Sequence, residues 1–304
     1  MASLKQIKGN IAAMKKSQAV TRAMEAVAAA KMRKSQQRAL GGRAYARAAA
    51  AILARVSGTR DAGSHPLAAT NPHAPRGLYI VITSDKGLAG ALNSSVLKAT
   101  LADIAREGLT AKDISIVAVG KKAHDYFAAR GFTLAHTAAN TDALSSYDMH
   151  TTVRIAQERY LSDEYRFAKV AYQNFVSTFE QRPILRTIFP LSLIELEKVV
   201  ADIIPAKGAY AHAPAEAPAA YAIEPSPEEV LGAILPKLAG VILYHALLES
   251  QASEHSARMV AMKSASDKAG EKQHELTLRF NKARQAAITR EVSEIIGGMD
   301  AVAN

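Results

Sequence analysis

Apolar residues recur at a spacing of three or four through the last quarter of the chain. The pattern covers residues 226–298 and contains few turn-forming residues. It opens with Ser226 as a side-chain N-cap, a proline at the next position, and Glu229 placed to complete a capping box. A pair of glycines, which can end a helix, closes it. The sequence predicts one long helix, with Pro236 and Gly270 as places where it could bend.

The beginning of the chain carries a second helical pattern. Residues 3–56 contain no proline and predict another long helix. Because a long helix with a narrow apolar stripe needs a partner, we expect the two to form an antiparallel coiled coil. A basic, acid-poor start is also typical of a mitochondrial presequence, but this pattern runs well past presequence length. The stripe keeps a heptad spacing and then drifts: Leu4, Ile7, Ile11, Met14, Val20, Met24 and Val27.

Strand patterns alternate with helix patterns in the middle of the chain. This alternation predicts a small, Rossmann-like α/β domain with a mostly parallel sheet. The last two strands are expected to form a hairpin that turns about residues 181–183. The expected strands are 78–82, 114–119, 132–136, 167–179 and 184–189, and the expected helices are 91–106, 122–129 and 149–161.

The predicted fold class is therefore α/β, a long antiparallel coiled coil of N- and C-terminal helices with an inserted α/β domain. Five parts follow from the pattern. They are a coiled-coil helix at 1–57, a linker at 58–76, the α/β domain at 77–206, a loop at 207–225 and the second coiled-coil helix at 226–304.

The net charge of +10 is unevenly distributed along the chain. Residues 1–57 hold twelve Lys and Arg against one acidic residue, a net +11. Residues 58–225 hold seventeen of each sign, and residues 226–304 hold nine basic and ten acidic residues. The excess on the first helix predicts an acidic partner. Nucleic acid is the alternative to protein carboxylates, although Tyr45 is the only aromatic residue on this helix.

The candidates for chemistry are weak. The turn at 84–90 follows a strand and precedes a helix, where α/β folds bind phosphates, but it matches neither the Walker nor the dinucleotide pattern. A structural turn and a nucleotide site are both compatible with it. Nine histidines are scattered without an HExxH motif, and the absence of cysteine excludes disulfides and thiolate sites. We expect no catalytic residue, cofactor or metal, and the apolar run at 238–248 is too short to span a bilayer.

The end of the last helix changes character. Small and polar residues at 284–291 are followed by Val292, Ile295 and Ile296. If this tip extends past its partner helix, these apolar side chains need another protein around them. Packing within the coiled coil is the alternative.

Four stretches make the chain similar to the gamma subunits of F-type ATP synthases. They are AKMRKSQ at 30–36, SDKGLAGALN at 84–93, EHSARMVAMK at 254–263 and FNKARQAAITRE at 280–291. The resemblance covers essentially the whole length. The family often has cysteine and glycine where this chain has Ala89 and Ala91, and the cysteine-bearing insertion of plastid members is absent.

The resemblance implies a central-stalk rotor without an active site of its own, which couples ion-driven rotation of the c-ring to conformational change in the catalytic subunits. The implied partners are three alpha and three beta subunits, the epsilon subunit and the c-ring of Fo, with no nucleic acid. The implied location is the cytoplasmic face of a bacterial inner membrane, reached only through the complex. The mitochondrial matrix side is the alternative.

The resemblance also implies contact residues. Glu224 would lie near the c-ring. Arg284, Gln285 and Thr289 would contact the catch loops of the catalytic subunits. The acidic lever loops of the same subunits would face Met24, Lys31, Arg33 and Lys34.

Overall fold

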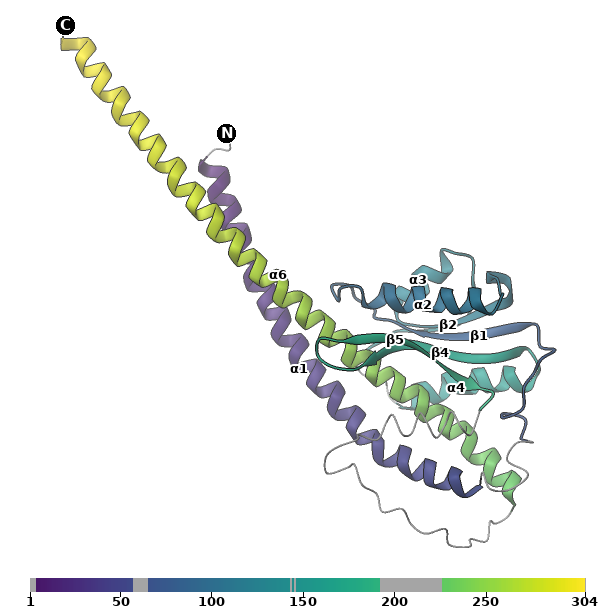
Figure 1. Cartoon of the computed structure of the whole chain (residues 1–304). Helices are drawn as coiled ribbons and strands as arrows, with labels where there is room; N and C mark the ends of the chain where they lie inside the picture. The colour runs from purple at the N-terminus through teal and green to yellow at the C-terminus, as the bar shows by residue number, and fades with distance from the viewer. Residues whose placement is uncertain (1–3, 57–64, 143, 145, 192–225, 304) are drawn as a thin grey trace. The chain divides into compact units, whose positions relative to one another are not determined.

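The computed structural model describes residues 4–56, 65–142, 144, 146–191 and 226–303 (Figure 1). The chain combines a five-stranded mixed sheet with a long helix at each end, as the sequence predicts. These helices are α1 (Leu4–Val56) and α6 (Pro227–Ala303). Residues 1–29 and 258–304 form one compact unit, and residues 30–257 form the other. Each long helix therefore contributes to both units.

The larger unit is built on a sheet with the strand order β3-β2-β1-β4-β5. The first four strands in the chain pair in parallel, and only the β4–β5 pair is antiparallel. The strands are β1 (Arg76–Ile82), β2 (Ile114–Val119), β3 (Thr133–Ala138), β4 (Tyr165–Phe175) and β5 (Gln181–Phe189). The connecting helices are α2 (Leu92–Arg106), the short η2 (Ala111–Asp113), α3 (Lys121–Ala128) and α4 (Ser146–Leu161).

Alternate residues of the central strand β1 enter two separate cores. Tyr79 and Val81 pack with residues of α2 and α3 on one face. Leu78, Ile80 and Ile82 pack with residues of α4 and α6 on the other. Because successive side chains of a strand point to opposite faces, a strand that is apolar throughout needs a helical layer on each side. Figure 1 shows these two layers.

The first part of α6 forms one of these layers together with α4. Its side chains at Leu231, Leu235, Leu238 and Leu243 are at most 2% exposed and belong to the core under the sheet. By length and composition alone, α6 contains an 18-residue window that could cross a membrane, with a mean hydropathy of 1.7. Half of that window is buried inside the protein, as in the core helix of an α/β domain.

Two expectations about where elements end are wrong. α6 continues through the glycine pair at 297–298, because glycine permits a left-handed turn without enforcing one. The hairpin turns at residues 176–180, and residues 181–183 already belong to β5. Pro183 pairs with Gln173 there, which is tolerated because β5 is an edge strand.

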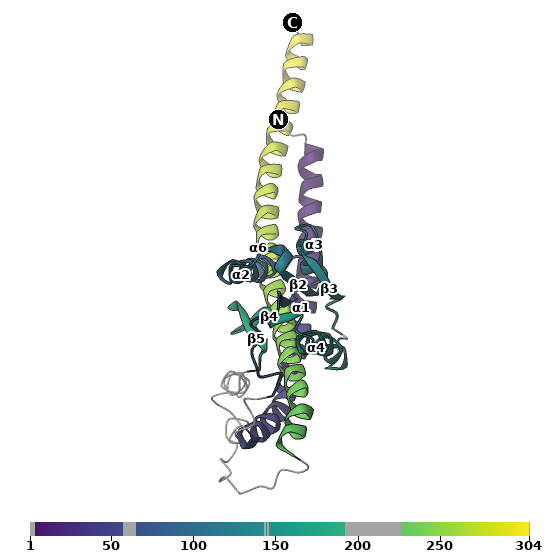
Figure 2. The same cartoon turned by 90° about the vertical axis from the view of Figure 1, so that its right-hand side faces the viewer.

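In the smaller unit, residues 4–29 of α1 and 258–303 of α6 lie side by side and antiparallel (Figures 1 and 2). The expected drift of the stripe through Val20 and Val27 is wrong, because these side chains are 50% and 57% exposed. Gln18 and Thr21 keep the heptad spacing instead and are partly buried. Once two helices pack, geometry fixes which positions face the seam, whether or not they are apolar. The less exposed positions of α1 include Leu4, Ile7, Ile11, Met14, Gln18, Thr21, Glu25 and Ala28.

The last turns of α6 extend past the start of α1 within this unit (Figure 1). Ile288, Val292, Ile295 and Ile296 are between 48% and 63% exposed. The described chain thus leaves an apolar stripe uncovered at this end, which is typical of a surface that binds another protein.

Candidate functional site

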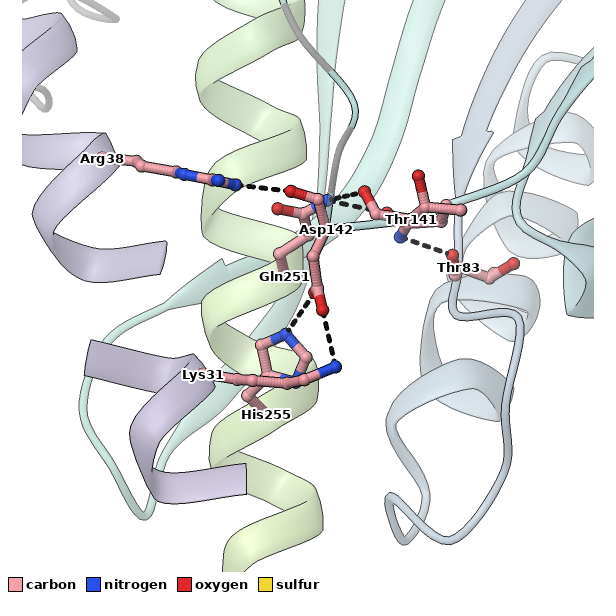
Figure 3. A network of polar contacts seen from close by, with 8 residues as sticks. Lys31, Arg38, Thr83, Thr141, Asp142, Gln251 and His255 are labelled. Carbon is pink, nitrogen blue, oxygen red and sulfur yellow. Dashed lines mark hydrogen bonds and ion pairs between the residues drawn. The ribbon is translucent and has the colours of Figure 1, made fainter. Parts of the chain in front are cut away.

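Asp142, in the segment after β3, is contacted by both long helices within the larger unit (Figure 3). From α1, Lys31 Nζ donates to Asp142 Oδ2 at 2.6 Å, and Arg38 Nη1 donates to the main-chain oxygen of Asp142 at 2.6 Å. From α6, His255 Nε2 lies 3.0 Å from Asp142 Oδ1. One residue therefore joins α1, α6 and the end of the third strand.

The environment of Asp142 keeps its carboxyl ionised. Burial by itself would raise its pKa, but the hydrogen bond from Lys31 and the contact with His255 outweigh burial and lower the pKa below its ordinary value. The Lys31 and Asp142 side chains are 46% and 44% exposed, whereas His255 is 6% exposed. An ion pair as exposed as Lys31–Asp142 contributes about 0–1 kcal/mol to stability. The contacts at this site therefore add little to stability, and their main effect is to fix the relative positions of α1, α6 and the segment after β3.

Further hydrogen bonds connect this segment to the carboxyl edge of the sheet. Gln251 Nε2 of α6 donates to Asn140 Oδ1 and to the Thr141 carbonyl, both at 3.0 Å. Asn140 Nδ2 in turn donates to the carbonyl of Thr83, just after β1, at 2.8 Å (Figure 3). Segment 140–142 is thus held by α6 on one side and by the sheet on the other.

The turn at 84–90 is a structural turn in this fold. Asp85 Oδ1 accepts hydrogen bonds from the main-chain N–H of Lys121, at the start of α3, and from that of Asn140, at 2.8 and 3.1 Å. A helix N-terminus attracts anions, and here the protein's own carboxylate occupies that position. Asn93 bonds both the main-chain N–H and the hydroxyl of Ser84. These contacts favour the structural interpretation of the turn over the nucleotide site.

Other candidate sites are weak in the described part of the chain. No group of three His, Cys, Asp or Glu side chains there could hold a metal ion. An open depression of about 410 Å³ lies between α2 and α3 and brings together one acidic residue, two lysines and a tyrosine. Its lining residues are Asn93, Ser94, Leu97, Lys98, Lys122, Asp125 and Tyr126.

The contact residues implied by the resemblance divide between the two units. Met24 is partly buried in the smaller unit, and Thr289 there is exposed, with its hydroxyl donating to the carbonyl of Gln285 at 2.9 Å. Arg284 and Gln285 are also exposed. Lys31, Arg33 and Lys34 belong to the larger unit and are exposed, although Lys31 already pairs with Asp142. Glu224 lies outside the described residues.

Sequence reasoning missed the Asp142 site. The basic excess of α1 predicted an acidic partner, and one such partner is Asp142 of the same chain. Nothing in the sequence distinguishes Asp142 from the other carboxylates, because Lys31 and His255 are more than a hundred residues away from it on either side. The tertiary structure alone brings the three together.

A family model and two related proteins match this chain over nearly its full length. The model of a family described as ATP synthase matches residues 3–302. The ATP synthase gamma chain of Pelotomaculum thermopropionicum is 36% identical over 305 residues, covering 99% of this chain and 100% of that protein. The gamma chain of Nitrosomonas eutropha is 37% identical over 303 residues, with the same coverage of both chains.

Solved structures resemble the chain in fold. One chain of the central stalk and c-ring of the Tetrahymena thermophila mitochondrial ATP synthase aligns with a TM-score of 0.58 at 23% identity, covering 81% of this chain and 99% of that chain. A chain of the Euglena gracilis mitochondrial ATP synthase, in an assembly of OSCP, F1 and c-ring, aligns with a TM-score of 0.63 at 19% identity. That alignment covers 98% of this chain and 94% of the other.

Proposed function

The chain belongs to the ATP synthase family, and from this premise we propose that it is the gamma subunit, which forms the central stalk of the complex. The observation that carries the proposal is the match to gamma chains over 99% of this chain and the whole of each relative. In this role the chain couples rotation of a membrane-embedded ring to conformational change in the subunits that make ATP.

The chain performs this role without an active site of its own. Support comes from the turn at 84–90, whose side chains are taken up by structural contacts: Asp85 accepts from the first N–H of α3, and Ser84 bonds Asn93 of α2. The chain acts through its partners, which we propose to be three alpha and three beta subunits, the epsilon subunit and the c-ring. It lies at the cytoplasmic face of a bacterial inner membrane and reaches the membrane only through the complex.

A stalk must present different faces to three otherwise equal partners. The excess of positive charge on residues 1–57 gives the two-helix seam one strongly basic helix beside a nearly neutral one. Moving a partner from 1:99 to 99:1 between two conformations needs about 5.5 kcal/mol of differential contact. The exposed basic side chains of Arg33 and Lys34 contribute to that difference by facing acidic loops. Lys31, which also pairs with Asp142, and Met24, seven residues before it, face the same loops in this proposal.

The exposed end of α6 is proposed to turn inside the ring of catalytic subunits. The stripe of Ile288, Val292, Ile295 and Ile296 fits an apolar sleeve, in which a shaft can turn without breaking directional bonds. Arg284, Gln285 and Thr289 lie exposed on the turns just before it and contact the catch loops of the catalytic subunits. Glu224 is proposed to lie near the c-ring.

Reconstitution tests the proposed function. The catalytic alpha–beta assembly is prepared with and without the full chain, and the rate of ATP hydrolysis is measured. We expect turnover to depend on the chain, because an axis that differs from side to side is what makes equal subunits alternate. Equal turnover in the two preparations would contradict the stalk function.

Reversing two charges on α1 tests the proposed lever contacts. The double variant Arg33→Glu/Lys34→Glu should pump roughly threefold fewer protons per ATP hydrolysed, or worse, because two exposed ion pairs of ~0.2–1 kcal/mol each become repulsive. ATP-driven proton uptake and ATP hydrolysis are measured on the same inverted membrane vesicles. The control Lys98→Glu/Lys112→Glu makes the same charge change on the α/β domain. An equal effect of both double variants would argue against a specific contact on α1.

A further inference from the structure

The contacts around segment 140–142 carry an inference about how the stalk holds together. We propose that Asp142 is a positioning residue that fastens α1 and α6 to the carboxyl edge of the sheet, so that these parts of the larger unit turn as one body. The inference rests on the proposed stalk function, because only a rotating part bears a torque at this junction.

Each helix grips the segment at two points. On α1, Lys31 and Arg38 are seven residues apart, which places them on one face about 10 Å apart along the axis. They bind the side chain and the main chain of the same Asp142. On α6, Gln251 and His255 are four residues apart and also share a face. Two anchor points on each helix oppose pivoting, which a single contact could not do.

Apolar packing of α1 near Asp142 does not by itself fix the position of the helix. Met32 and Ser35 are the buried positions of α1 within residues 30–38, so only one of the two is apolar. Apolar packing resists separation but is non-directional, and small side chains do little to fix a register. Charge-assisted hydrogen bonds are directional and hold one geometry. Asp142 supplies these bonds to both helices at once.

The chain of bonds also continues beyond the helices. Gln251 holds Asn140, which bonds the carbonyl of Thr83 at the end of β1. The main-chain N–H of Asn140 bonds Asp85, which also holds the start of α3 through Lys121. Segment 140–142 is therefore continuous with the loops at the carboxyl ends of the parallel strands. A torque on the α/β domain reaches α1 through Asp142.

The half-exposed Lys31–Asp142 pair allows the proposed role to be distinguished from a role in stability. Because the Lys31–Asp142 pair is worth little in water, loss of the carboxylate should leave the fold nearly intact. The effect should appear only when torque passes between the α/β domain and the two helices, as fewer protons pumped per ATP hydrolysed. A residue with a purely structural role would instead lower stability and assembly together.

The test uses the whole ATP synthase in inverted membrane vesicles. For Asp142→Ala we expect at least a twofold drop in ATP-driven proton uptake per ATP hydrolysed, with the hydrolysis rate within twofold of wild type. Asp142→Glu should restore most of the coupling because it keeps the carboxylate. The matched control is Asp125→Ala, which removes an exposed carboxylate from α3 of the same domain. Coupling in Asp142→Ala equal to wild type would overturn the proposal.

A charge exchange separates the pair from each residue alone. Lys31→Asp and Asp142→Lys should each lower the coupling ratio, and the double variant should recover at least half of the combined loss if the two groups act through each other. Additive losses would overturn the fastening role. A failure of the proposed stalk function would look different: the alpha–beta assembly would then hydrolyse ATP equally well with and without the chain.

Discussion

Replacing Gly120 by alanine is expected to destabilise the α/β domain strongly. Gly120 precedes α3 with φ of 99°, and an added Cβ would lie 2.1 Å from the carbonyl oxygen of Thr83. That oxygen belongs to backbone at the end of β1 and cannot rotate away. Conformational strain and the clash together should cost on the order of 4 kcal/mol or more, a large effect for one methyl group.

The loss should appear as a lower thermal midpoint, by roughly 8–16 °C for a domain of this size. Near-UV circular dichroism follows the domain selectively, because none of the ten tyrosines lies in residues 1–29 or 258–304. Gly131→Ala is the matched control: its φ is 74°, yet nothing lies within 4 Å of the added Cβ. If both variants melt at the same temperature, the close approach to Thr83 has no energetic weight.

Asp103→Ala should destabilise the same domain through its charges. The Asp103 carboxylate is 4% exposed and accepts hydrogen bonds from Lys169 Nζ and Tyr79 Oη, both at 2.8 Å. Removing one member of a buried ion pair costs about 3–5 kcal/mol, because the remaining charge loses its partner. We expect the lower end, about 3 kcal/mol, since Glu107 still holds Lys169 at 2.7 Å.

Arg106→Ala is the control for this prediction, because Arg106 pairs with the same carboxylate but is 75% exposed. Its removal should change the thermal midpoint little. Equal midpoints for the two variants would show that burial of the Lys169 pair has no energetic consequence.

The same carboxylate predicts a pH dependence. Burial by itself would raise the pKa of Asp103, but the hydrogen bonds from Lys169 and Tyr79 outweigh it, so the folded-state pKa lies below the ordinary value. A lowered folded pKa means that the stabilisation is fully present above the unfolded value, near ~3.9, and is lost as pH falls through the folded pKa. Wild type should therefore lose more of its thermal midpoint than Asp103→Asn on acidification below about pH 4. Parallel curves for the two proteins would contradict this.

Much of the fold follows from residue patterns within single segments. Nearly continuous apolar runs at residues 78–82 and 114–119 indicate buried parallel strands, and an apolar spacing of three or four indicates both long helices. These patterns are local, because the period of side chains along a strand or helix is fixed by its own backbone. The resemblance of four short stretches to gamma subunits was likewise present in the sequence, and the comparisons confirm it.

Only the tertiary structure decided which of these elements meet. It placed the first part of α6 in the core under the sheet, where the sequence pattern suggested only a coiled coil. It kept polar Gln18 and Thr21 toward the seam and left Val20 and Val27 exposed, because packing selects positions by angle around the helix. It also joined Lys31 and His255 through Asp142, across more than a hundred residues on each side. A half-exposed carboxylate has no local periodicity that could mark it, so its partners become visible only when the chain is folded.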